Sequence, residues 1–87
     1  MIQKDQVDFI TTGQMRAARA LIGLSQEELA ALSGVSIPTL KRCESDSENA
    51  PIVSTRTRTK ICLALIAAGV EFIPQNGGGP GVRLARS

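Results

Sequence analysis

Cysteine is the strongest nucleophile in the chain, and it occurs twice, as Cys43 and Cys62, in apolar helical patterns. A catalytic thiol needs a neighbouring base, and the chain has no histidine. A closed zinc site needs four ligands, so two cysteines without histidine do not predict a metal site. We therefore expect two buried, reduced thiols, with a disulfide as the minor alternative, and neither an enzyme nor a bound metal or cofactor.

Basic side chains that can bind a polyanion are grouped along the chain, although the net charge is only +2. The groups lie at residues 16–19, 41–42, 56–60 and 83–86. An arginine guanidinium can bond bidentately to the O6 and N7 atoms of guanine, so the chemistry of these groups suits DNA. The small net charge permits a nucleic-acid partner without establishing one.

Glycine is concentrated between residues 74 and 81, between two short apolar segments at 70–73 and 82–84. A phosphate-binding glycine loop leads from a strand into the N-terminus of a helix, and no helical pattern follows this one. We therefore interpret the segment as the turn of a β-hairpin that lies against the last helix, with a phosphate loop as the disfavoured alternative.

Helical patterns fill the rest of the chain. Apolar periodicity and end signals predict four helices, at about 13–22, 26–33, 37–44 and 55–68. The first two begin with capping boxes, at Thr11 and at Ser25. In the second helix we expect three residues to face inward, namely Leu29, Ala30 and Leu32.

These elements predict one small, mainly α domain: a compact bundle of four helices that contains a helix-turn-helix, with a short C-terminal β-hairpin. Residues 1–10 read as a flexible arm, 11–68 as the DNA-binding domain, and 69–87 as an extension that covers the last helix or forms a dimer interface. The longest apolar run, at 61–70, is about half a membrane span, and the N-terminus has no signal-peptide pattern. We expect a cytoplasmic, nucleoid-associated protein without a membrane partner.

The helix-turn-helix prediction rests on the segment 26–42. Ala30 is small where two helices must cross, and Gly34 suits a left-handed turn. The next helix begins with Ser36 and Pro38, and it would protrude as a rod that fits the major groove. This segment resembles the helix-turn-helix of Cro/cI-type repressors, the Xre family. The resemblance covers about 12–68, and the 69–84 tail resembles, more weakly, the C-terminal extensions of some small bacterial members.

The resemblance implies a DNA-binding surface. Its members in this sequence are Gln26, Ser36, Ile37, Pro38, Thr39, Lys41, Arg42, Arg56 and Arg58. Gln26 matches a phosphate contact, the start of the recognition helix faces bases, and Arg42 matches a later base contact. The resemblance also implies a partly buried ion pair between Arg19 and Glu44 that orients the recognition helix.

Two residues depart from the family pattern. Ile37 replaces a polar base-reading residue, and Pro38 cannot donate a hydrogen bond, so specific readout would depend on Arg42. We expect a homodimer that binds a palindromic site on double-stranded DNA as a transcription regulator. The alternative is a protein-binding module of antiactivator or antitoxin type. Repression and activation both stay open, and acidic residues at Glu44, Asp46 and Glu48 would be the contact for RNA polymerase or another regulator.

Overall fold

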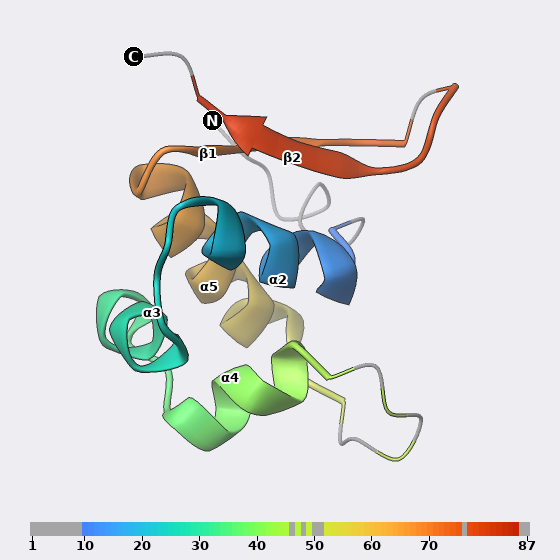
Figure 1. Ribbon diagram of the computed structural model, residues 1–87. Helices are drawn as coiled ribbons and strands as arrows, with labels where there is room; N and C mark the ends of the chain where they lie inside the picture. The colour runs from blue at the N-terminus through green and yellow to red at the C-terminus, as the bar shows by residue number, and fades with distance from the viewer. Residues whose placement is uncertain (1–9, 46, 48, 50–51, 76, 86–87) are drawn as a thin grey trace.

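A computed structural model of the protein describes residues 10–45, 47, 49, 52–75 and 77–85. Within these residues, four helices form a bundle and a two-stranded hairpin lies across one end of it, while α4 lies at the opposite end (Figure 1). The predicted fold class is confirmed. The proposed arm lies outside the described residues except for Ile10, and so do Asp46 and Glu48 of the acidic cluster. None of the described helices is long and apolar enough to cross a membrane.

Helix α2 (Thr12–Leu21) begins with the predicted capping box. The Thr11 hydroxyl accepts a hydrogen bond from the backbone N–H of Gln14, and the Gln14 side chain accepts one from the backbone N–H of Thr11. Met15 and Ala18 are fully buried on the inner face of the helix. The cap therefore fixes where the helix begins, and the apolar spacing fixes which face it buries.

Helices α3 (Gln26–Ser33) and α4 (Ile37–Cys43) pack against each other and form the predicted helix-turn-helix. The Ser25 capping box starts α3, and Gly34 ends it with a left-handed φ of 72°. A side chain at this position would be strained by the positive φ. Ser36 caps α4, and Pro38 lies in its first turn, where a backbone N–H has no helical partner.

The prediction that Leu32 faces inward is wrong, because its side chain is 61% exposed. The buried side of α3 is centred between Leu29 and Ala30, which are both buried. At 100° per residue, Leu32 lies roughly 110° around the helix from that centre. The three apolar residues of this two-turn helix therefore span a wider face than the one that the helix buries.

Helix α5 (Thr55–Ala67) runs through the middle of the core and contacts α2, α3 and the hairpin. Its side chains at Ile61, Cys62 and Leu65 are fully buried, whereas Leu63 stays partly exposed. The apolar run thus packs on several neighbours, as its all-round hydrophobicity predicts.

Strands β1 (Val70–Ile73) and β2 (Gly81–Leu84) form the predicted antiparallel hairpin. Strand β1 contacts α5, as expected, and β2 contacts α2, so the hairpin covers two helices (Figure 1). Gln14 stabilises the contact between α2 and the hairpin. Its Nε2 atom donates to the carbonyl oxygens of Ile73 and Gly81, at 3.1 and 3.0 Å. One buried amide therefore caps α2 and ties it to the sheet.

Candidate nucleic-acid interface

The two sides of α4 differ in burial. Leu40 and Cys43 are buried against the bundle, whereas Pro38, Lys41 and Arg42 are exposed. The buried residues are three apart and fix the rotation of the helix about its axis. Two cationic side chains therefore project from the exposed side of a helix that the core holds in place.

The first turn of α4 is closed by its own side chains. The Ser36 hydroxyl accepts from the backbone N–H of Thr39 and donates to the Thr39 hydroxyl, at 3.3 and 2.8 Å. Ile37 is half-buried and packs against the core. Ser36 therefore serves as the cap, and the side chain of Ile37 is partly committed to packing.

Arg19 and Glu44 form an ion pair between α2 and the end of α4. The Arg19 Nε and Nη2 atoms donate to the two carboxylate oxygens of Glu44, at 2.8 and 3.0 Å. The Glu44 side chain is only 4% exposed, and the Arg19 side chain is 23% exposed. This bidentate geometry is the strongest form of the pairing. The pair expected from the resemblance is present.

Gln26 also binds this carboxylate. Its Nε2 atom donates to Glu44 Oε1 at 3.0 Å, and Arg19 Nη1 donates to the carbonyl of Leu24 at 3.1 Å. We call Arg19, Gln26 and Glu44 the carboxylate cluster. It joins the first residue of α3 and the end of α2 to the end of α4, so α2 and both helices of the motif share one buried charge.

The segment that contains most of α2 and all of α3 and α4 is similar to a known family. Residues 15–52 match the model of the helix-turn-helix family. The chain contains a helix-turn-helix domain. Domains of this family are typically the DNA-binding modules of transcription regulators and are not typically enzymatic. No curated protein matches the chain.

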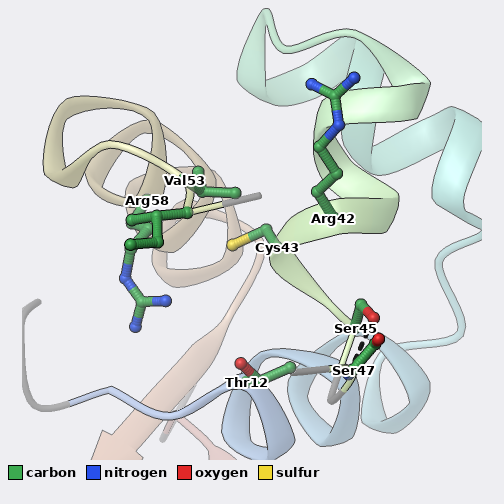
Figure 2. A pocket seen from close by; sticks show the side chains of 8 residues that line it. Thr12, Arg42, Cys43, Ser45, Ser47, Val53 and Arg58 are labelled. Carbon is green, nitrogen blue, oxygen red and sulfur yellow. Dashed lines mark hydrogen bonds between the residues drawn. The ribbon is translucent and has the colours of Figure 1, made fainter. Parts of the chain in front are cut away.

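Arg58 lies on the first half of α5, beside the helix-turn-helix. Its guanidinium donates to the backbone carbonyl of Ile10, so this side chain holds the segment before α2. Figure 2 shows the Arg58 and Arg42 guanidinium groups pointing in opposite directions around a pocket of about 280 Å³. The pocket therefore does not combine them into one anion site. Arg56, by contrast, is exposed.

Both cysteines lie in the core of the helix-turn-helix domain as free thiols. Cys43 packs with its Sγ atom 3.2 Å from Met15 Sδ. Burial raises the pKa of the Cys43 thiol, and it raises the pKa of Cys62 to about 12. Such thiols stay protonated near neutral pH and are poor nucleophiles.

Two contacts were not anticipated from the sequence. Gln14 was assigned to the cap alone, and Gln26 to a phosphate rather than to Glu44. The contact of Gln14 with the hairpin has a signal in the sequence, because Gln in a capping box has N–H donors that Glu lacks. The second depends on the crossing of α3 and α4, which no local pattern gives.

Proposed function

We propose that the protein binds double-stranded DNA sequence-specifically as a homodimer on a palindromic site, with α4 in the major groove. The observation that carries this proposal is the arrangement of α4: a buried carboxylate cluster fixes its end, and Arg42 and Lys41 project from its exposed side. A helix that the core holds in place and that carries an exposed guanidinium suits bidentate recognition of guanine. A module of this size reads only a few base pairs, which favours a two-fold dimer.

The other proposed contacts follow from position. Pro38 and Thr39 belong to the first turn of α4, the part that enters the groove first, and Ile37 offers at most a partial apolar contact to a thymine methyl. Gln26 donates one N–H to Glu44 and keeps a second for a phosphate oxygen. Exposed Arg56 remains a phosphate contact, and Arg58 gives one N–H to the Ile10 carbonyl and keeps the others for a phosphate oxygen.

Selection of binding sites from a pool of random duplexes tests the proposal. We expect the wild-type protein to enrich a palindromic motif. Arg42→Ala should blur one position in each half-site and weaken binding to the selected duplex about tenfold or more, because a bidentate base contact contributes roughly 1–3 kcal/mol.

Arg83→Ala is the matched control, since it removes the same charge from the hairpin at the opposite end of the molecule. It should keep the motif and the affinity of the wild type. Each protein is measured at two salt concentrations, because contacts to phosphate give a steep loss of affinity with salt. Equal effects of the two variants would contradict the assignment of α4 as the reading helix.

The exposed Pro38 and the half-buried Ile37 favour a second function, a protein-binding module of antiactivator or antitoxin type. These residues weaken hydrogen-bond readout at the start of α4. This function predicts no enriched motif and weak binding to DNA that is indifferent to Arg42. Affinity purification from cells would then retrieve a regulator or RNA polymerase, and Arg42→Ala would not reduce its recovery.

A further inference from the structure

The exposed side of α4 combines two cations with one apolar side chain. Its exposed residues are Lys41, Arg42 and Pro38. Ile37 is half-buried and packs against the core, so its side chain is partly committed to the protein. The hydroxyl of Thr39 is bonded to the hydroxyl of the N-cap residue, at 2.8 Å. The ring of Pro38 is therefore the apolar group that the first turn of α4 presents to a partner.

Pro38 and Arg42 lie in one line along α4. Residues four apart on a helix are neighbours, with about 5–6 Å between their Cβ atoms. A helical side chain also leans toward the N-terminus, so the Arg42 side chain extends over the turn that contains Pro38. Figure 2 shows it extended away from the other labelled residues. We call Pro38 and Arg42 the reading pair, because the two side chains can contact neighbouring base pairs at the same time.

We propose that the reading pair recognises a guanine together with a pyrimidine 5-methyl group within two base pairs of it. Arg42 donates to guanine O6 and N7, and the ring of Pro38 packs on the methyl group. The thymine methyl is the apolar group that base edges present in the major groove, whereas the other groups there need a donor or an acceptor, which the ring lacks. The inference rests on the proposed function and names the bases that it reads.

The spacing of the reading pair agrees with this assignment. Stacked base pairs are about 3.4 Å apart, so side chains whose Cβ atoms lie about 5–6 Å apart reach base pairs that are one or two steps apart. Two sources supply the methyl group, because thymine and 5-methylcytosine carry it at the same ring position. A protein that reads the group on cytosine responds to DNA methylation.

A proline in the first turn also suits the start of a helix, and that role alone makes a different prediction. A proline that only starts the helix affects binding to every duplex alike, because it contacts no base. A proline that packs on a methyl group affects binding only where the methyl group is present. Removal of the methyl group from the DNA therefore separates the two roles.

Binding to two duplexes, followed by fluorescence anisotropy, measures the contact. The first carries the selected motif. In the second, deoxyuridine replaces the thymine nearest the guanine that depends on Arg42, which removes the methyl group alone. We expect the wild type to bind the deoxyuridine duplex about fourfold more weakly, the effect of one methyl-sized apolar contact. Pro38→Ala should bind both duplexes equally and still prefer the guanine. Equal binding by the wild type overturns the inference, and so does a fourfold ratio that persists in Pro38→Ala.

Lys41→Ala is the matched control, because it changes an exposed residue of α4 outside the reading pair. A lysine contact to phosphate is indifferent to sequence, so this variant should weaken binding to both duplexes by the same factor and keep the fourfold ratio. A ratio that disappears in Lys41→Ala and persists in Pro38→Ala would show that the assignment to Pro38 is wrong.

Two further duplexes distinguish the sources of the methyl group. They carry a cytosine–guanine pair in place of the thymine–adenine pair, without and with a 5-methyl group on the cytosine. We expect the wild type to bind the methylated duplex about fourfold more tightly than the unmethylated one, and Pro38→Ala to bind both equally. A methyl group that counts on thymine alone supports the contact with thymine and overturns the response to cytosine methylation.

The duplex selection separates this inference from the proposed function. Because the random pool is unmethylated, thymine is the expected base beside the guanine. A motif with a guanine that depends on Arg42 but without a thymine within two base pairs overturns the reading pair alone. A pool without an enriched motif overturns the DNA-reading function, and the reading pair falls with it.

Discussion

Two ion pairs at opposite ends of the molecule use the same chemistry in different surroundings. Arg19–Glu44 joins two helices, and its carboxylate side chain is 4% exposed. Glu71–Arg83 lies across the hairpin at 2.5 Å, with side chains that are 47% and 63% exposed. Water can solvate either partner of the second pair if the other is removed, whereas removing Arg19 or Glu44 leaves a poorly solvated charge. A shorter distance therefore does not make the hairpin pair the more important one.

The two ends also differ in how they are attached to the bundle. The carboxylate cluster ties α2, α3 and α4 together through side chains alone. The hairpin is held by the packing of Phe72 and Val82 and by the Gln14 amide, which bonds to backbone carbonyls. We infer that one buried charge holds α4 in place at one end of the molecule, which we call the recognition end. One neutral amide holds the hairpin in place at the other end. Substitutions at the two ends of the molecule separate these two modes of attachment.

The largest effect is expected at the recognition end. Glu44→Ala should lower the free energy of unfolding by about 3 kcal/mol, because it leaves the Arg19 guanidinium without its carboxylate. Glu71→Ala, which breaks the exposed pair of the hairpin, should leave the free energy almost unchanged. Urea unfolding followed by circular dichroism measures both variants.

A paired replacement sharpens this result. Arg19→Met combined with Glu44→Leu removes both charges and fills the space with apolar atoms, so it should recover much of the stability lost in Glu44→Ala. The recovered protein should still bind the selected duplex more weakly than the wild type if the cluster orients α4. Full affinity in the double variant would contradict that orienting role.

An intermediate effect is expected at the hairpin end. Gln14→Glu keeps an oxygen for the Thr11 N–H and therefore keeps the α2 cap, but it turns a carboxylate toward the carbonyls of Ile73 and Gly81. We expect a loss of about 2 kcal/mol, since two donors are replaced by a buried acceptor. Hydrogen exchange should become faster in the hairpin amides and much less so in α3 and α4.

Thr11→Ala is the matched control, because it weakens the same cap and leaves both hydrogen bonds to the hairpin. It should cost about 1 kcal/mol, with faster exchange in the first turn of α2 only. If Thr11→Ala loosens the hairpin as much as Gln14→Glu does, then Gln14 acts through the cap and the proposed tie is wrong.

Local signals predict most of the fold. The capping boxes at Thr11 and Ser25, the left-handed Gly34 and the paired apolar segments each act within a few residues, and the structure agrees with all of them. The burial of Leu32 was predicted wrongly because the pattern of a two-turn helix cannot define its inward direction when only two of its residues are buried.

Local signals predict less of the candidate site than of the fold. The Arg19–Glu44 pair was expected only through a family resemblance, since residues 25 positions apart carry no local signal of contact. The bonds from Gln26 to Glu44 and from Arg58 to Ile10 depend on how helices cross, and they change which donors remain for DNA. Whether a side chain is available to contact DNA therefore depends on its contacts in the packed structure.

The smallest effect comes from the thiols beneath the recognition end. An unfolded thiol ionises near its ordinary pKa of 9.0, whereas burial raises the pKa of folded Cys62 to about 12. Between these values the folded protein binds the extra proton, so its stability falls as the pH rises. From pH 8 to pH 10 we expect a loss of roughly 1 kcal/mol from Cys62, measured by urea unfolding. Cys43 adds a loss in the same direction.

Comparison of variants assigns this pH dependence to the helical core. Cys62→Ala lowers stability at every pH by creating a cavity, but the difference between pH 8 and pH 10 should shrink, because the titrating group is gone. The hairpin pair should not contribute, since Glu71 raises the pKa of Arg83 and keeps its guanidinium charged in this range. A variant Glu71→Ala should therefore show the same pH dependence as the wild type. An unchanged slope in Cys62→Ala would mean that this thiol is not the source of the pH dependence.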